Sequence, residues 1–369
     1  MRSVEVVVIG QGLAGTTLAW SLYRRQWSAV IVEKNFMNSS SHIAAGLATP
    51  ITGRRLVPCW EWSTAKAHAD RSYRLAESLT ASKFWYTQTA LRLFASADEQ
   101  AQFSRREETA ATLMMPYAER DWGADGQRFD NTWGGFQMPD AARLETAKYL
   151  EVSRDFFEKQ GWYYRAAIDS HRDLEVDDHG FTFPTLGLRS RWLILAEGFQ
   201  PAPHPWFPSL PLAPCQGDIL TLRIPQLHEQ RALHRGVWLT PCSPDEGAGS
   251  DTYLAGSTYL WDRCDGVVRA EQRERLLDRL RAFLRVPIEI LDHRTAVRPT
   301  SFDQKPLLGP SPRHPRLWIC NGLWSKGALY GPWMAEWLLD AMQQRSAIPP
   351  ALRWDRRGAA SAAVPGETR

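Results

Sequence analysis

Residues 4–15 read Val-Glu-Val-Val-Val-Ile-Gly-Gln-Gly-Leu-Ala-Gly, and this stretch decides the fold. Its apolar half, residues 4–9, predicts a buried strand that leads directly into a Gly-x-Gly-x-x-Gly turn. Helix-like sequence follows to about Gln26, and a second apolar run, 29–32, ends in Glu33. A strand, a glycine turn, a helix, a strand and an acid in this order are typical of a dinucleotide-binding unit.

Each glycine of the turn has a physical reason. Gly10 lets the chain turn sharply, Gly12 lets a pyrophosphate approach the backbone, and Gly15 lets the helix pack closely on the sheet. The helix N-terminus, with Leu13 and Ala14, offers unpaired N–H groups and a partial positive charge to phosphates. The alternative is an ordinary glycine turn between two core elements.

The acid at the end of the second strand points to the nucleotide. Glu33 lies 23 residues after Gly10, where a carboxylate can accept hydrogen bonds from an adenosine ribose. We count the adjacent Lys34 among the candidate cofactor contacts. An acid rather than an arginine at position 33 argues against NADP, but the motif does not separate FAD from NAD.

Length and composition bound the class of protein. The 369 residues are enough for two domains, and 44% hydrophobic with 23% charged residues describes a soluble globular protein. The net charge of +3 is too small to argue for nucleic acid or a membrane surface as partner. No stretch approaches the roughly 20 apolar residues of a membrane span.

The cysteines indicate a reducing compartment. They are scattered, odd in number and without CxxC or metal-ligand spacing: Cys59, Cys215, Cys242, Cys264 and Cys320. We therefore expect free thiols and no metal site. The N-terminal apolar run is too short for a signal peptide, so we expect a cytoplasmic protein.

The middle of the chain predicts mixed helices and strands. We expect one strand over 85–94, a helix over 98–120, a helix over 141–160 capped by Asp140, a half-buried strand over 215–224 and another strand over 252–259. The apolar run 190–195, closed by Gly198, predicts a parallel strand that ends near the nucleotide.

A second strand, glycine-turn and helix unit closes the chain. We expect a strand over 317–320, a turn over 321–331, and a helix over 332–342 that starts with Pro332. This unit would present a second helix N-terminus to a ligand. The small-residue tail 358–369 is expected to be disordered.

Four motifs in order resemble the D-amino-acid oxidase and glycine oxidase family of FAD-dependent amine oxidoreductases. They are the opening glycine unit, Ala44-Ala-Gly-Leu-Ala-Thr-Pro50, Arg298-Pro299 followed by Asp303-x-x-Pro306-x-x-Gly309, and Gly322-x-x-x-x-Gly327-x-x-x-x-Pro332. Two further stretches, 255–261 and 321–327, resemble the flavin domain of the bifunctional tRNA wobble-uridine enzyme, which removes a carboxymethyl group from a secondary amine.

The resemblance implies an α/β (α+β) fold with two domains. A Rossmann-like FAD-binding domain of the glutathione-reductase type would comprise 1–80, 136–214 and 296–357. A mainly antiparallel substrate domain would comprise 81–135 and 215–295.

The resemblance also implies which residues contact FAD. Besides the glycine unit, the segment 42–47 and the turn 322–328 would lie against the flavin ring, and these contacts comprise His42, Ala44, Ala45, Gly46, Leu47, Gly322, Leu323, Trp324, Ser325, Lys326, Gly327 and Ala328. The last helix N-terminus would stabilise negative charge on the reduced flavin.

Three residues are the candidates for catalysis. Arg298 resembles the arginine that pairs with a substrate carboxylate in this family, a task that suits a bidentate guanidinium. Tyr259 would belong to the substrate-domain wall. Lys326 would favour reduced flavin or peroxide formation, although Ser325-Lys326 departs from the commoner oxidase pattern. Structural alternatives are an ion pair for Arg298, core packing for Tyr259 and a surface position for Lys326.

The sequence thus predicts an FAD-dependent amine or amino-acid oxidoreductase. Its partners would be a small carboxylate-bearing amine and O2 or another electron carrier, with hydride passing to flavin N5. Three alternatives stay open: an NAD-dependent dehydrogenase, an RNA-modifying flavoprotein that acts on a tRNA wobble uridine, and a flavin-dependent monooxygenase.

Overall fold

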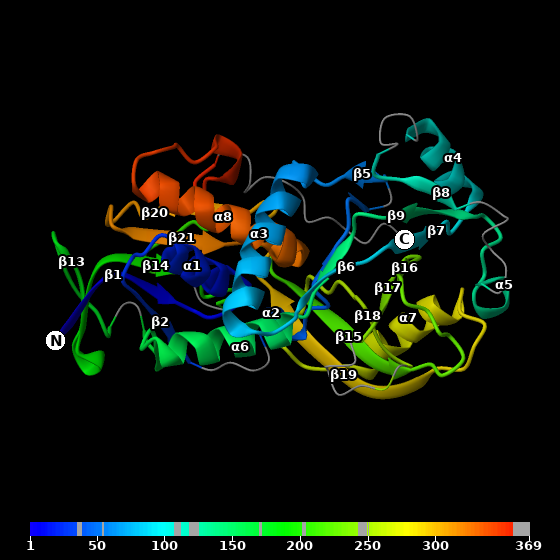
Figure 1. The fold of residues 1–369 in the computed structure, drawn as a ribbon, viewed down its shortest axis with the longest axis horizontal. Coiled ribbons are helices and arrows are strands. Elements are labelled where there is room, and N and C mark those ends of the chain that lie inside the picture. The colour runs from blue at the N-terminus through cyan, green and yellow to red at the C-terminus, as the bar shows by residue number, and fades with distance from the viewer. Residues whose placement is uncertain are drawn as a thin grey trace.

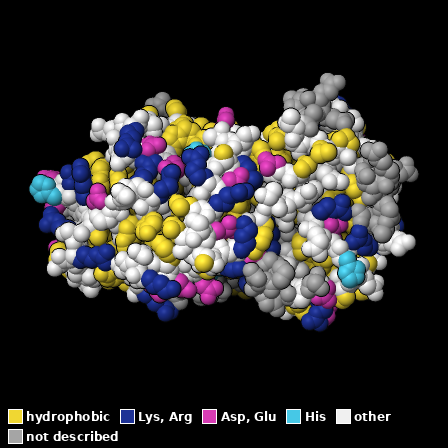
Figure 2. Space-filling model, in the orientation of Figure 1, with side chains coloured by type: hydrophobic (Ala, Val, Ile, Leu, Met, Phe, Trp, Pro, Cys, Tyr) yellow, Lys and Arg dark blue, Asp and Glu magenta, His cyan; other side chains and the backbone are white. Residues whose placement is uncertain are grey.

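The computed structural model describes residues 1–34, 39–53, 55–106, 112–117, 125–169, 172–200, 204–242, 249 and 251–356. These residues form two eight-stranded sheets, one three-stranded sheet and one two-stranded sheet. The two large sheets lie at opposite ends of an elongated molecule (Figure 1). Basic and acidic side chains are interspersed over the face drawn in Figure 2. The tail predicted to be disordered lies outside the described residues.

The first sheet is built around the strand that precedes the glycine turn. β1 runs parallel to β2 on one side and to β14 on the other, and β11 and β21 extend this parallel order. The remaining strands are antiparallel. The members of the sheet are β1 (Arg2–Ile9), β2 (Ala29–Glu33), β11 (Tyr163–Arg165), β12 (Glu175–Asp177), β13 (Gly180–Phe183), β14 (Leu188–Leu195), β20 (Leu307–Pro310) and β21 (Leu317–Asn321).

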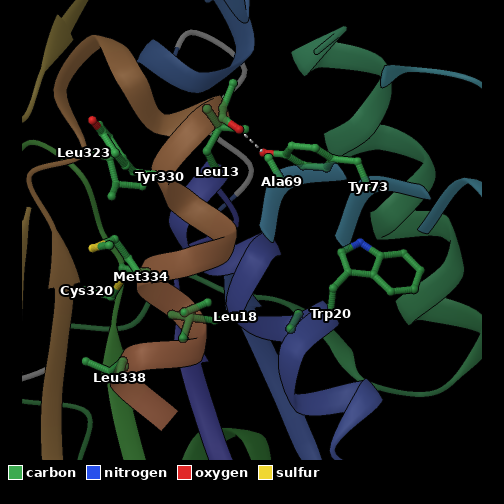
Figure 3. Close-up of a cluster of buried hydrophobic side chains, with 14 of the residues drawn as sticks. Leu13, Leu18, Trp20, Ala69, Tyr73, Cys320, Leu323, Tyr330, Met334 and Leu338 are labelled. Atoms are coloured by element: carbon green, nitrogen blue, oxygen red, sulfur yellow. Dashed lines mark hydrogen bonds between the residues drawn. The ribbon is translucent and has the colours of Figure 1, made fainter. Parts of the chain in front are cut away.

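Four helices cover one face of this sheet. Their apolar sides and the sheet form a large cluster of buried side chains, part of which is drawn in Figure 3. Within it, the fully buried Tyr73 packs against Tyr149 with ring centroids 5.1 Å apart. The helices are α1 (Leu13–Arg24), α3 (Trp62–Thr80), α6 (Thr146–Lys159) and α8 (Gly327–Met342).

The last helix begins earlier than predicted. α8 starts at Gly327, and Pro332 lies inside it rather than at its first position. Proline has no N–H, so the carbonyl four residues earlier, on Ala328, receives no helical hydrogen bond from it. The Tyr73 hydroxyl donates to this carbonyl at 2.8 Å, a bond drawn in Figure 3. A donor from α3 therefore lets the helix extend toward the N-terminal side of Pro332.

The second sheet is mainly antiparallel, with one parallel pair between β16 and β7. Helix α7 (Ala270–Arg281) packs on one face through leucine side chains. Strand β15, next to the edge strand, was expected to be half-buried, but almost all of it is buried, because Leu220 and Leu222 pack in the cluster with α7 and Ile219 packs in a second cluster on the other face. The strands, in sheet order, are β19 (Glu289–Arg298), β15 (Cys215–Arg223), β18 (Thr252–Gly256), β17 (Trp238–Pro241), β16 (Ala232–His234), β7 (Ala90–Leu93), β9 (Gly135–Met138) and β8 (Met115–Tyr117).

Three predicted elements are wrong in detail. The strand expected over 85–94 is two strands in different sheets, because the chain crosses between the sheets after β6 (Trp85–Thr87). The helix expected over 98–120 is α4 (Ala97–Arg106), and β8 replaces its last part. Asp140 does not cap a helix. It accepts a hydrogen bond from Trp62 Nε1, and residues 142–144 form a strand instead.

Short elements link the two large sheets. They are α2 (Ser40–Ile43), β3 (Leu47–Ala48), β4 (Ile51–Thr52), β5 (Val57–Pro58) and β10 (Ala142–Leu144). The short helix α5 (Asp125–Arg128) instead connects β8 and β9 at the far end of the second sheet (Figure 1). We keep the division into two domains at the predicted boundaries as a proposal. The first large sheet lies wholly in the proposed FAD-binding domain, but these boundaries cut β9 and β19 of the second sheet, so that residues 136–138 and 296–298 fall on the FAD-binding side. None of the helices in the described parts of the chain is long and apolar enough to cross a membrane.

Candidate active site

The first glycine turn is tightly packed. Gly10 has a φ of +102°, and a Cβ there would lie 2.4 Å from the carbonyl oxygen of Ala196. A Cβ on Gly15 would lie 1.8 Å from the carbonyl oxygen of Gly10. Both positions therefore require glycine, one for its conformation and both for close backbone approach.

A serine from the short helix α2 lies over the start of α1. Ser41 Oγ accepts a hydrogen bond from the Leu13 N–H at 3.0 Å, and a Cβ on Gly12 would lie 2.9 Å from the same oxygen. Sequence reasoning missed Ser41. Its signal was only a small polar segment, in which several serines are equivalent until the chain folds.

The acid at the end of β2 faces the glycine turn. Glu33 Oε2 accepts a hydrogen bond from the Gln11 N–H at 2.5 Å, and Arg154 Nε donates to Gln11 Oε1 at 3.0 Å. Burial lowers the pKa of His42, Arg154 lowers it further, and Glu33 acts in the opposite direction. His42 is therefore a neutral imidazole at neutral pH, and its Nδ1 lies 2.8 Å from Ser39 Oγ.

The segment 44–48 is held by the start of α6 and by β10. Thr146 Oγ1 donates to the Ala44 carbonyl at 2.6 Å, and the Leu144 N–H donates to the Gly46 carbonyl at 3.0 Å. Gly46 has a φ of +69°, and a Cβ there would lie 1.9 Å from the Leu144 carbonyl oxygen. These bonds fix the path of the segment along the cavity wall.

The second glycine turn brings another helix N-terminus to the same place. Asn321 Nδ2 donates to the Gly198 carbonyl at 2.8 Å, which ties the end of β21 to the end of β14. A Cβ on Gly327 would lie 2.9 Å from Leu13 Cδ1, so the first turns of α1 and α8 are in contact. Lys326 Nζ donates to Thr52 Oγ1 at 3.4 Å.

Arg298 lies on the cavity side of the second sheet. Its guanidinium occupies the space over Gly217, where a Cβ would lie 2.0 Å from it. Arg298 NH1 donates to the Thr258 carbonyl at 3.3 Å and approaches Cys215 Sγ at 3.8 Å. The Tyr259 ring lies 5.0 Å from the guanidinium carbon. Among the described residues, no carboxylate forms an ion pair with Arg298.

One cavity of about 1590 Å³ brings these groups together. Two predicted site residues, Gly15 and Gly322, do not line it. The predicted residues that line it are Gly10, Gly12, Leu13, Ala14, Glu33, Lys34, His42, Ala44, Ala45, Gly46, Leu47, Gly198, Tyr259, Arg298, Leu323, Trp324, Ser325, Lys326, Gly327 and Ala328. Residues that sequence reasoning missed include Ser41, Glu197, Trp238 and His293.

These features fit a dinucleotide. Two helix N-termini meet at one cavity, each beside a glycine turn, and helix N-termini attract phosphate and other negative charge. Glu33 lies at the rim beside the first turn. A parallel sheet with such a site, facing a mainly antiparallel sheet that carries an arginine, defines a dinucleotide-dependent oxidoreductase.

A family model, FAD dependent oxidoreductase, matches residues 5–341. The chain therefore belongs to this FAD-dependent family, and FAD is its cofactor. The predicted family and cofactor are confirmed, and the NAD-dependent alternative is excluded. The glycine turns and the contacting N-termini of α1 and α8 are the parts of this chain that suit FAD.

Individual known proteins are also similar to this chain in sequence or in structure. The chain is 25% identical to the tRNA 5-methylaminomethyl-2-thiouridine biosynthesis bifunctional protein MnmC of Marinobacter nauticus, over 93% of this chain and 56% of that protein. It thus spans little more than half of that relative's length. Among solved structures, glycine oxidase from Geobacillus kaustophilus has a TM-score of 0.77 at 17% identity, covering 96% of this chain and 99% of that one.

A second solved structure has a similar fold. Iminodiacetate oxidase from Chelativorans sp. BNC1 has a TM-score of 0.70 at 19% identity, covering 94% of this chain and 97% of that one. These likenesses confirm the predicted fold class, a Rossmann-like FAD-binding part with a second, sheet-rich part.

Proposed function

We propose that this enzyme oxidises the C–N bond of a carboxylate-bearing amine, either an amino acid or an N-substituted one, to an imine. Water then hydrolyses the imine to a carbonyl compound and either ammonia, from an amino acid, or a smaller amine, from an N-substituted one. The observation that carries this proposal is the Arg298 guanidinium on the cavity wall without an acidic partner among the described residues. A cation in this state is suited to a substrate carboxylate.

Each candidate residue has a distinct task in this proposal. Arg298 binds the carboxylate, and the Tyr259 ring, packed against the guanidinium, limits its movement. Bound FAD supplies the hydride acceptor. Lys326 and the N-terminus of α8 favour negative charge at the adjacent cavity wall. The protein therefore contributes mainly orientation and electrostatics, because the redox chemistry belongs to the cofactor.

The oxidised substrate and the final electron acceptor are separate questions. We propose that O2 or another cellular carrier reoxidises the enzyme. Oxygen as acceptor would give one H2O2 per turnover, so a peroxide assay in air-saturated buffer separates an oxidase from a dehydrogenase.

The test is anaerobic bleaching of the flavin spectrum with a panel of amines. The panel holds D- and L-amino acids, sarcosine, other N-substituted glycines, and the matching amines without a carboxylate. We expect bleaching only by one carboxylate-bearing class. Bleaching by amines regardless of the carboxylate would contradict the proposal, and bleaching by NAD(P)H alone would favour a monooxygenase.

Arg298→Ala provides the residue-level test. A hydrogen bond to a charged group contributes about 1.5–3 kcal/mol, so the KM for the carboxylate-bearing amine should rise roughly ten- to hundred-fold. Arg298→Lys keeps the charge but loses the two-pronged geometry, so its KM should lie between those of the wild type and Arg298→Ala. An unchanged KM in Arg298→Ala would remove the carboxylate anchor.

A second candidate function is oxidation of a secondary amine carried by a modified uridine in tRNA. The likeness to MnmC over 93% of this chain favours it. The net charge of +3 and the interspersed charges in Figure 2 do not favour a polyanion. Salt-dependent binding of undermodified tRNA, together with bleaching by it, would support this second candidate over a free amine.

A further inference from the structure

The strand pairing beside Arg298 contains a β-bulge. β15 and β18 pair regularly from Arg223↔Thr252 to Ile219↔Gly256. Pairing resumes at Gln216, whose N–H and carbonyl both bond to Leu260. Two residues of β15 therefore oppose three residues, 257–259, of the other chain segment. Such an extra residue changes the direction in which neighbouring groups point, and bulges recur beside active sites.

Thr258 lies in the middle of this bulge. Its Oγ1 accepts the Asp218 N–H at 2.9 Å, in place of the backbone carbonyl that an unbroken ladder would offer. The same hydroxyl donates to Asp218 Oδ2 at 2.7 Å. The Thr258 carbonyl is then turned toward Arg298 NH1, which donates to it at 3.3 Å.

Asp218 is held in turn from the edge strand β19. Its side chain is fully buried, and His293 Nε2 lies 2.9 Å from Oδ1. A carboxylate only accepts hydrogen bonds, so Nε2 is the donor in this contact. His293, Asp218 and Thr258 thus form one chain of hydrogen bonds that ends at the guanidinium of Arg298.

We propose that Asp218 and Thr258, supported by His293, are positioning residues that fix the orientation of Arg298 toward the substrate carboxylate. This inference rests on the proposed function. Among the described residues, the Thr258 carbonyl is the oxygen that accepts a hydrogen bond from the Arg298 guanidinium. The other acceptor, Cys215 Sγ, is more distant at 3.8 Å. The peptide at 258 therefore decides which guanidinium N–H groups remain for a ligand.

Asp218 and Arg298 lie on opposite faces of the second sheet. Asp218 follows the alternation of Leu220 and Leu222, which pack against α7, so its carboxylate lies on the face of β15 opposite to Gly217, and Asp218 does not line the cavity. Arg298 lies on the cavity side with Gly217. Asp218 thus fixes Thr258 from one face of the sheet, and the Thr258 carbonyl fixes Arg298 on the other face. In this arrangement no acid of the described residues lies beside the arginine, where it would compete with the substrate carboxylate.

The test compares Thr258→Val with Thr258→Ser in the FAD-loaded enzyme. Valine keeps the shape but removes the hydroxyl, and serine keeps the hydroxyl. The probe is acetate, titrated by perturbation of the visible flavin spectrum, with acetamide as the uncharged comparison. We expect Thr258→Val to raise the acetate Kd about tenfold and Thr258→Ser to keep it within about twofold. Acetamide binding should not distinguish the two variants.

The possible results distinguish a failure of this inference from a failure of the proposed function. Absence of acetate binding in the wild type, or an unchanged acetate Kd in Arg298→Ala, would remove the anchor and the positioning residues together. A raised Kd in Arg298→Ala with wild-type affinity in Thr258→Val would remove only the positioning role. Should Thr258→Val fail to retain FAD, Asp218→Asn carries the same comparison, and an acetate Kd equal to that of the wild type would refute the proposal.

Discussion

The hydrogen bond from Tyr73 to α8 supports a sharp test of how that helix reaches the cavity. The Tyr73 hydroxyl donates to the Ala328 carbonyl at 2.8 Å, and both residues are buried. Pro332 cannot supply the usual donor to this carbonyl. Tyr73→Phe therefore leaves a buried carbonyl unsatisfied, which costs about 1–3 kcal/mol in free energy of unfolding.

Pro332→Ala should reduce the free-energy cost of Tyr73→Phe. Alanine restores an N–H four residues after Ala328, so the carbonyl regains a helical donor. Tyr73→Phe should then be cheaper in the Pro332→Ala background, by about 1 kcal/mol or more. Burial also raises the pKa of Tyr73 well above its usual value, so the hydroxyl remains a donor across the working pH range.

The assay is urea unfolding of the four proteins of the cycle, followed by fluorescence and far-UV circular dichroism. Tyr149→Phe is the matched control, because this buried hydroxyl has no partner among the described residues. Its removal should not destabilise the protein. Costs of Tyr73→Phe that agree within about 0.5 kcal/mol in the two backgrounds would refute the reasoning.

Three further predictions test other parts of the site and the fold. Gly10→Ala would place a Cβ 2.4 Å from the Ala196 carbonyl at a φ of +102°, so the purified variant should retain little FAD, measured by its 450 nm absorbance. Gly217→Ala would displace the guanidinium of Arg298, so the acetate Kd should rise while FAD retention stays near that of the wild type. Burial raises the pKa of Glu336, but hydrogen bonds from α1 and from the arginine after it outweigh burial and lower that pKa below 4.5. Its contribution to stability is therefore present above pH 4.5 and lost as pH falls through the folded-state pKa, and Glu336→Gln should flatten the acid side of the stability profile.

The opening strand, glycine turn and helix were predictable because their geometry is largely local. Gly10, Gly15 and Glu33 lie within one continuous strand, turn, helix and strand. The positive φ of Gly10 and the approach of Gly15 to the Gly10 carbonyl arise within this unit, although Gly10 also approaches the distant Ala196 carbonyl. The apolar runs 4–9 and 29–32 also read directly as strands of a covered parallel sheet. Local pattern and tertiary structure agree over this unit.

The errors occurred where a distant residue overrides a local preference. Pro at position 332 is a good first residue of a helix, but Tyr73 satisfies the Ala328 carbonyl, 255 residues further along the chain, that the proline leaves free. Asp140 is a good N-cap, but residues 142–144 pair with both β3 and β6. No window of sequence contains either partner, so neither outcome follows from propensity.

The surroundings of Arg298 could not be predicted from pattern because one extra residue reverses the alternation. In an unbroken strand over 252–259, Thr258 would share the cavity face with Leu254 and Gly256, and Tyr259 would face α7 with Tyr253. The bulge turns the Thr258 hydroxyl toward Asp218 and the Tyr259 ring toward Arg298. Tyr259 was assigned to the substrate wall by family resemblance, whereas periodicity alone would have assigned it to the opposite face. The groups around the arginine are thus set by register, which only the paired strands define.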